Sequence, residues 1–280
     1  VGSEMCIRDR GLSLTSKINS DISYFSSHNL IGYKEGTSKP DEYLIFMAHW
    51  DHLGINDELI GDQIFNGAAD NAAGVAAVIE LARKFDQVQT ERSIIFTALT
   101  LEESGLLGSA YLAENPPVDL ANIVAGFNFD RVLPTGKTKD MAVIGYGASE
   151  LEDYLEKELE KQGRYINPDP NPEKGYFYRS DHISFAKKGV PVLYSDDGFD
   201  LEDGGIEKGF NEIYDYTNFR YHGVKDEYDP SWNLEGFEQT INTIFNISLD
   251  LSNSSDWPNW YEGNEFRATR DAQLSSKNTP

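Results

Sequence analysis

The sequence is poor in cysteine, with Cys6 as its single thiol among 280 residues. One thiol cannot form an internal disulfide, and it excludes the zinc sites that are built from several thiolates. Histidine is also scarce, with five residues in the whole chain. Any metal bound by this protein must therefore be held by nitrogen and oxygen ligands, with few imidazoles to choose from.

Positive charge is the second shortage. The chain has 24 Lys and Arg against 47 Asp and Glu, which gives a formal net charge of -23. This charge repels nucleic acid and anionic lipid, so we predict no nucleic-acid partner. The excess of acid suits solubility in a salty setting, and it also attracts cations and peptides with a free amino group. Composition alone leaves both interpretations open.

Long hydrophobic runs are absent, since no stretch approaches the ~18 to 20 apolar residues that a membrane span needs. With 39% hydrophobic residues, the chain suits one globular domain. We interpret residues 1–12, which open with "VGSEMCIRDRG", as foreign sequence or a disordered start, because their pattern joins to nothing downstream. We expect a domain over 13–265 and a polar tail over 266–280 that frays.

Short apolar runs alternate with helical patterns along the chain. This alternation predicts an α/β fold with a central, mostly parallel, twisted mixed sheet and helices on both of its faces. The predicted buried strands are 43–49, 92–100, 122–130, 141–147 and 189–196. We expect a Pro-rich loop over 167–175, because Pro recurs there.

Three helices are predicted from the spacing of apolar residues. One covers 70–85, with Asp70 and Asn71 as capping candidates. A second begins near Ser149, where Glu152 completes a capping box, and a third begins near Asn233. The first helix has the inward stripe Val75, Val78, Ile79, Ala82 and Phe85. The third has the inward stripe Leu234, Phe237, Ile241, Ile244 and Phe245.

Polar side chains gather where the predicted strands end. The first strand ends at His49, the next helix begins at Asp70, the second strand runs into Glu102 and Glu103, and the third ends at Asp130. Each alone has an ordinary structural explanation, such as a core histidine or a helix cap. Together, at the ligand-binding edge of a parallel sheet, the carboxylates would repel one another unless a cation offset them.

Imidazole and carboxylate are the ligands that zinc takes, with Mn²⁺ or Co²⁺ as substitutes. Glu102 and Glu103 are then expected to have different roles, because neighbouring residues at a strand end point to different sides. One binds metal, and the other serves as a general base. The residue types leave the choice of histidines open, because His52 lies at a chelating spacing from His49 and His182 is as suitable as His222.

Six segments in order carry a resemblance to a known family: "HWDHLG", "NGAADNAAGVAAVIELAR", "LEESGLLGSAYL", "NFD", "YRSDHISFAKKGVPVLY" and "RYHGVKDEYD". Over roughly residues 25–265 the chain resembles the two-zinc aminopeptidases, which include bacterial leucyl aminopeptidases and, more distantly, glutamate carboxypeptidase and glutaminyl cyclase. The resemblance implies the zinc-exopeptidase (phosphorylase/hydrolase-like) fold.

The resemblance also implies a ligand set for two Zn²⁺ ions. His49 and Asp130 would hold one ion, Glu103 and His222 the other, and Asp70 would bridge both. Glu102 would be the general base, and Asp51 would orient His49 with its carboxylate from behind.

Further residues are placed by the same resemblance. Ser180, Asp181 and His182 would lie by the substrate pocket without binding metal. Tyr178 is a candidate for stabilising an oxyanion, although ordinary aromatic packing explains it as well.

Two positions depart from the family pattern. Arg131 follows Asp130 where an apolar residue is usual, and we expect strand alternation to turn it away from the metals. Ala73 replaces a common serine without touching the ligand set.

The expected function is therefore hydrolysis of N-terminal residues from peptides with a free N-terminus. Two alternatives from other classes are a glutaminyl cyclase with a single zinc and a non-catalytic binding ectodomain of the same fold. The protease-associated domain and secretion signal of many relatives are not visible, so we expect an N-terminally truncated chain whose natural location is extracellular or periplasmic. We expect side-chain preference to depend on loops such as 196–221.

Overall fold

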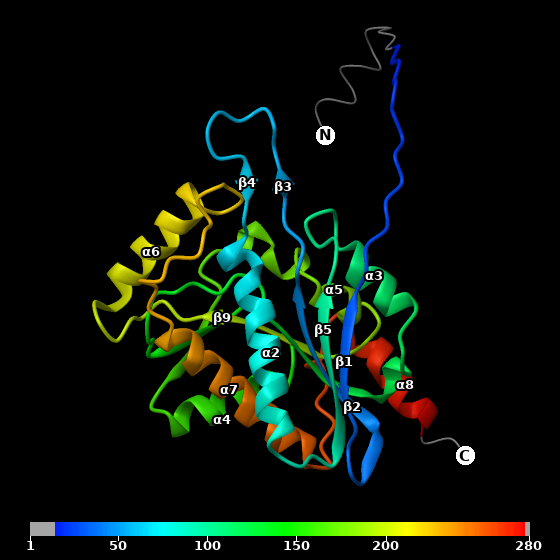
Figure 1. The fold of residues 1–280 in the computed structure, drawn as a ribbon. Helices are drawn as coiled ribbons and strands as arrows, with labels where there is room; N and C mark the ends of the chain where they lie inside the picture. Colours follow the sequence, from blue (N-terminus) through cyan, green and yellow to red (C-terminus); the bar gives the residue numbers. More distant parts are fainter. Residues whose placement is uncertain (1–14, 278–280) are drawn as a thin grey trace, which may run out of the picture.

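A seven-stranded sheet forms the centre of the protein (Figure 1), and the computed structural model describes it within residues 15–277. The interpretation of residues 1–12 as foreign sequence lies outside this part. In spatial order the strands are β1 (Leu30–Lys34), β5 (Arg92–Leu99), β2 (Lys39–His49), β6 (Ile123–Asn128), β9 (Val192–Asp197), β7 (Asp140–Val143) and β8 (Tyr165–Pro168).

The four central strands run parallel, and the antiparallel pairings lie toward the two edges. β5, β2, β6 and β9 pair in parallel, whereas β1 is antiparallel to β5 and β7 is antiparallel to β9. The predicted mostly parallel mixed sheet is confirmed. The sequence did not reveal the edge strands β1 and β8, because their residues are largely exposed or half-buried and lack a buried apolar run.

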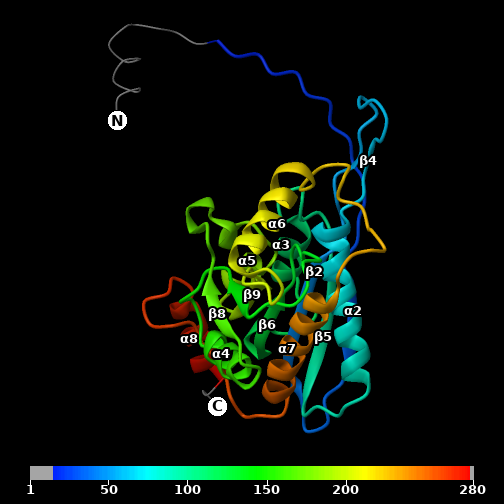
Figure 2. The ribbon, with the colours of Figure 1, turned by 90° about the vertical axis from the view of Figure 1, so that its left-hand side faces the viewer.

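Helices cover both faces of the sheet, as predicted. α2 (Ala73–Asp86), α4 (Leu151–Lys161) and α7 (Glu235–Ser252) pack on one face. α3 (Leu107–Glu114), α5 (His182–Ala186) and α8 (Arg267–Lys277) lie on the other. Figure 2 shows α2 and α8 on opposite sides of the sheet. α6 (Gly205–Phe219) lies near the carboxyl ends of the central strands.

The central strand β2 supplies both hydrophobic cores. Leu44 and Phe46 point to the α2 and α7 face, and Ile45 and Met47 point to the α3 and α5 face. The Phe46 ring stacks on that of Phe127, with ring centroids 5.2 Å apart. A strand buried on both faces must be apolar at every position, which explains the continuous run that predicted it.

The start of α2 differs from the prediction. The helix begins at Ala73, after a π-helical turn over Ala68–Ala72 in which Asp70 and Asn71 have non-helical backbone angles. Asn71 Oδ1 accepts a hydrogen bond from the Gly74 N–H at 3.0 Å, so Asn71 caps the helix and Asp70 does not. Asp70 is thereby left free to face the site.

Parts of two predicted helical faces also need correction. On α2, Ile79 is half exposed, and Leu81 is buried in its place. The capping prediction for α4 is confirmed at the backbone, because the Glu152 carboxylate accepts the Ser149 N–H at 3.2 Å. On α7, Leu234 precedes the helix and is exposed.

Two segments predicted as loops contain regular structure. The Pro-rich stretch begins inside β8 and ends in a 3₁₀ turn over Pro172–Lys174. The segment 196–221 contains α6. A short hairpin of β3 (Gly54–Ile55) and β4 (Ile64–Phe65) protrudes above the sheet (Figure 1). Within residues 15–277, no helix has the length and apolarity to cross a bilayer.

The prediction that the tail frays is wrong for the described residues, since α8 packs on the body. Arg270 is fully buried, and its Nη2 donates to the main-chain carbonyls of Ile123 at 2.8 Å and Val124 at 3.3 Å. Its guanidinium also lies over the Trp257 ring at 5.4 Å from the centroid. A polar residue anchors this helix, which an apolar-pattern argument cannot detect.

Replacing Arg270 with Met should lower the free energy of unfolding by about 1 to 3 kcal/mol, because charge-assisted hydrogen bonds to buried carbonyls are lost. Chemical denaturation would measure the change. Arg83→Met is the matched control, since Arg83 lies on α2 with a side chain that is 76% exposed. Equal stability of the two variants would contradict the anchoring role of Arg270.

Candidate metal centre

The parallel strands bring the predicted site residues to one edge of the sheet. β2 ends at His49, whose register partner on β5 is Leu99, three positions before Glu102. β6 ends at Asn128, two positions before Asp130. Because carboxyl ends of parallel strands share an edge, residues far apart in sequence converge there.

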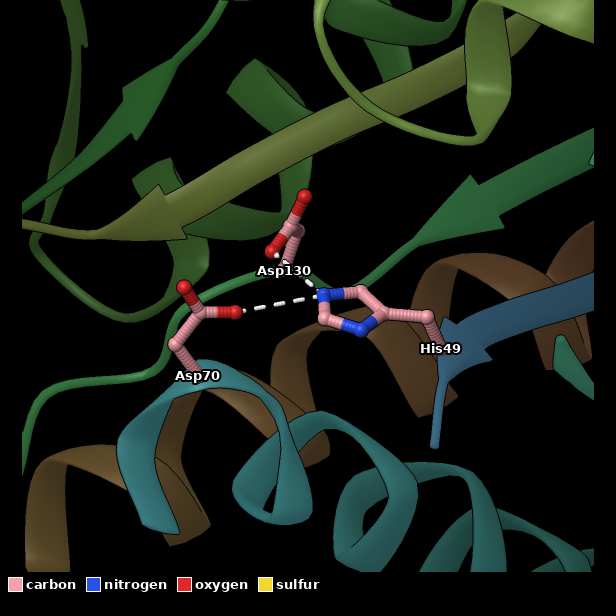
Figure 3. Close-up of side chains that lie close together, drawn as sticks. All are labelled: His49, Asp70 and Asp130. Atoms are coloured by element: carbon pink, nitrogen blue, oxygen red, sulfur yellow. Dashed lines mark hydrogen bonds and ion pairs between the residues drawn. The ribbon is translucent and has the colours of Figure 1, made fainter. Parts of the chain in front are cut away.

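One group consists of His49, Asp70 and Asp130 (Figure 3). His49 Nε2 lies 3.2 Å from Asp70 Oδ1 and 3.3 Å from Asp130 Oδ1. His49 and Asp70 are almost fully buried. The three ligand-type atoms lie within 4.8 Å of one another, a spacing that suits a single metal ion.

The second group lies on the other side of Asp70. Asp70 Oδ2 lies 3.3 Å from His222 Nε2. The same nitrogen of His222 lies 3.1 Å from Glu103 Oε2. The two oxygens of Asp70 therefore face two different histidines. This is the arrangement expected of a carboxylate that bridges two ions.

His52 belongs to the second group as well. Its Nδ1 lies 2.8 Å from Glu103 Oε1, and His52, Asp70 and Glu103 also form a cluster within 4.8 Å. The sequence left His52 open as a ligand, and the resemblance selected His222. The structure brings both imidazoles to Glu103, with ring centroids 5.8 Å apart.

Asp226 fixes the backbone at Asp70 and was not singled out from the sequence. Its buried carboxylate accepts the N–H groups of Ala69 and Asp70, each at 3.0 Å, and the hydroxyl of Tyr216 at 3.2 Å. Asp226 lies inside the quoted "RYHGVKDEYD" segment, and the only signal in the sequence was an acidic residue within that segment.

Asp51 lies against both His49 and the glutamate pair. Its carboxylate is 3.8 Å from His49 Nδ1, and the hydrogen bond to this nitrogen, at 3.1 Å, goes to the main-chain carbonyl of Asp51. The carboxylate instead accepts the N–H groups of Glu102 at 3.1 Å and Glu103 at 3.3 Å. Asp51 thus positions the two glutamates.

Strand alternation, from which we expected Arg131 to turn away from the metals, does not apply at this residue. β6 has already ended at Asn128, so strand alternation does not reach Arg131, whose φ is 60°. Among the described residues, the non-glycine residues with positive φ are Leu101, Leu106, Arg131 and His222. All four belong to the site or its immediate flanks, where such conformations commonly gather.

A cavity of about 410 Å³ opens beside the two groups. Its metal-facing side has Asp70, Glu102, Glu103, Asp130 and His222. The remaining lining residues are Gly105, Leu106, Arg131, Ile144, Tyr176, Tyr178, Arg179, Tyr194, Asp196, Thr217 and Tyr221.

Ser180, Asp181 and His182 lie behind the cavity wall and outside its lining. Burial lowers the pKa of His182 to about 3 and raises that of Asp181 to about 7. Tyr178 does line the cavity, and its hydroxyl donates to Glu265 at 2.8 Å.

Protonation of the site follows from burial and crowding. Burial, followed by the negative charge of Asp130, raises the pKa of Glu102 to about 9. Hydrogen bonds that His222 donates to Asp70 and Glu103 raise its pKa to about 10. Burial opposes protonation of His49, yet Asp130 and Asp70 hold its pKa well above the usual value.

The residues present fit a zinc centre. Among residues 15–277, the ion pairs of Asp70, Glu103 and Asp130 are with histidines and never with Lys or Arg. Carboxylates crowded in this way need a cation, and imidazole with carboxylate is zinc's ligand set. The number of ions is a separate question.

Sequence and structure comparisons point to one family. The chain is 33% identical over 273 residues to a "Probable zinc metalloprotease" of Pyricularia oryzae, covering 81% of this chain and 53% of that protein. The fold matches an aminopeptidase from Aneurinibacillus sp. strain AM-1, with a TM-score of 0.60, 20% identity and coverage of 82% and 49%. It also matches a glutaminyl cyclase of Porphyromonas gingivalis, with a TM-score of 0.54, 18% identity and coverage of 80% and 77%.

The chain spans about half the length of the Pyricularia protein and of the Aneurinibacillus aminopeptidase. The family match itself covers residues 29–247, which include both candidate ligand groups and the adjacent glutamate pair. The chain therefore belongs to peptidase family M28.

Proposed function

We propose that this protein is a metallo-aminopeptidase that uses two zinc ions. The observation that carries the proposal is the placement of Asp70, which presents one oxygen to His49 at 3.2 Å and the other to His222 at 3.3 Å. A carboxylate shared in this way suits two neighbouring cations better than one.

His49, Asp70 and Asp130 would hold one ion, and Asp70, Glu103 and His222 the other. When bound, the zinc ions supply Lewis-acid polarisation of the peptide carbonyl and lower the pKa of water. The protein contributes the fixed positions of these side chains. Asp226 and Asp51 hold the backbone on which three of the site's carboxylates stand.

Glu102 is the proposed general base. It lines the cavity and makes no ion pair among the described residues, so its carboxylate is available to substrate and water. Hydrolysis breaks the C–N bond of the peptide. The oxygen of water is added to the carbonyl carbon, and one proton of water goes to the leaving amine. Glu102 takes that proton and delivers it to the amine nitrogen. A cation nearby would keep its pKa below the value of about 9.

The preference for N-terminal residues is supported by the names of the structural neighbours and by the limited cavity of about 410 Å³. A cavity of this size suits the end of a peptide better than its middle. The extracellular or periplasmic location stays a prediction from the resemblance.

Replacing Glu102 with Gln should lower kcat by about a hundredfold to ten-thousandfold, because the amide cannot accept the proton. Release of an N-terminal residue from an unblocked peptide, compared with its Nα-acetylated form, measures the activity. Elemental analysis should give two zinc ions per chain in both the wild type and the variant.

Glu103→Gln is the matched control, because it changes the neighbouring carboxylate and should lower zinc content. Full activity of the Glu102 variant would refute its role as base. One zinc per chain, with cyclisation of an N-terminal glutamine, would favour the cyclase alternative. Failure to bind zinc would favour a binding ectodomain.

Zinc binding should release about three protons at pH 7. One comes from Glu102, whose pKa of about 9 a nearby cation lowers, and one each comes from His49 and His222. The pKa values of both histidines are raised without metal, so both imidazoles carry a proton that a metal must displace. The apparent zinc affinity should therefore fall as pH decreases.

Titration calorimetry in buffers with different ionisation enthalpies would count these protons. His28→Ala is a control, because His28 lies outside both ligand groups and should leave the count unchanged. Zinc affinity that is constant between about pH 6 and pH 8 would contradict the assignment of these histidines as ligands.

A further inference from the structure

Three cations lie around the ring of Tyr176, which lines the cavity. The Tyr176 centroid lies 5.3 Å from the guanidinium carbon of Arg179, 5.8 Å from Lys174 Nζ and 6.0 Å from the guanidinium carbon of Arg131. The chain carries 24 Lys and Arg against 47 Asp and Glu, so this gathering is unusual for it.

Arg131 has unused capacity for hydrogen bonds. A guanidinium has five N–H donors, and among the hydrogen bonds of residues 15–277 Arg131 makes one, from Nη2 to Asp196 Oδ2 at 2.8 Å. Its side chain is 21% exposed and lines the cavity. A guanidinium with free donors on a cavity wall can donate them to acceptors on a molecule that enters the cavity.

The charges divide between the main cavity and a smaller extension of about 60 Å³. Arg131 and Asp196 line both spaces. The main cavity adds Arg179, whereas the extension adds Lys174 with Asp169 and Asp197. Apart from the proposed ligands and base, the main cavity therefore has excess positive charge, and the extension has excess negative charge.

We propose that the wall formed by Arg131, Arg179 and Tyr176 binds a carboxylate of the peptide substrate in the main cavity. The inference rests on the proposed function, since it assigns a substrate class to the same site. The carboxylate has two possible sources, an acidic side chain on the N-terminal residue or the free C-terminus of a short peptide.

A carboxylate matches this wall in geometry and in charge. Its two oxygens accept from the planar fork of a guanidinium, which an ammonium or an apolar group cannot do. Burial of Arg131 strengthens such a contact, because solvent competes weakly there. Asp130 and Arg131 are neighbours, so the bound carboxylate would lie close to the reacting carbonyl.

The test compares matched pairs of substrates that differ only in this charge. Glu and Gln p-nitroanilides report the side-chain source, and the dipeptide Leu-Ala against its C-terminal amide reports the terminal source. Wild-type kcat/KM should favour the charged member of one pair by about 10- to 100-fold, as expected for loss of a charge-assisted hydrogen bond.

The variants are Arg131→Met and the double change Arg131→Met with Asp196→Asn. The double variant avoids leaving Asp196 buried without its partner. Both should bring the favoured ratio close to one. Arg83→Met, on the exposed face of α2, is the control and should keep the wild-type ratio.

Absence of preference in both pairs, a ratio unchanged in both variants, or faster cleavage of a Lys p-nitroanilide than of the Glu substrate would overturn the proposal. If no substrate is cleaved, the aminopeptidase proposal fails. The carboxylate-binding proposal is then tested by measuring ligand binding. Calorimetry of the zinc-loaded protein would then compare glutamate with glutamine and Leu-Ala with its amide. A charge preference that disappears in the double variant supports the wall, and equal binding refutes it.

Discussion

The site depends on a single carboxylate, that of Asp70, which must face two histidines from distant parts of the chain. His49 stands at the end of β2, and His222 follows α6 in a left-handed backbone conformation. Neither histidine would define a paired site without an acid between them. The burial of Asp226 beneath Asp70 is therefore as consequential as the ligands, because its hydrogen bonds fix the backbone that carries the shared carboxylate.

Charge balance explains how such a site exists before metal arrives. Glu102, Glu103 and Asp130 stand together without a Lys or Arg partner in the described part of the chain. The elevated pKa values of His49 and His222 mean that protonated imidazoles act as the internal counter-charges. Metal binding replaces those protons with divalent charge. The affinity for metal therefore depends on the pKa values of the ligands.

The sequence predicted the central strands and the gathering of polar residues at one sheet edge, because both follow from strong local patterns. A strand buried on both faces is a continuous apolar run, and its polar end residue identifies the sheet edge. The resemblance was still needed to select among histidines, and the structure leaves His52 beside Glu103. Residue type and spacing cannot separate imidazoles that converge from different loops.

The failures share a cause, which is that polar contacts lack a periodic signature. Arg270 anchors α8 by donating to a main-chain carbonyl. The Asp51 carboxylate accepts the Glu102 N–H in the loop that follows β5, a contact that the sequence did not predict. β1 and β8 lie at the edges, where apolar runs are not required. Sequence periodicity reports burial of apolar surface, whereas these elements are held by hydrogen bonds that only the folded chain reveals.

Arg131 shows how chemistry and selectivity are joined in this chain. The backbone leaves β6 after Asn128 and turns into a left-handed conformation at Arg131, so consecutive side chains enter the cavity. Asp130 lies at the ligand group and Arg131 lies against Tyr176, with no intervening segment to adjust independently. A change in this turn would move a ligand and the cationic wall together. The position of a substrate carboxylate is therefore tied, in the proposed enzyme, to the position of the ion that acts on its carbonyl.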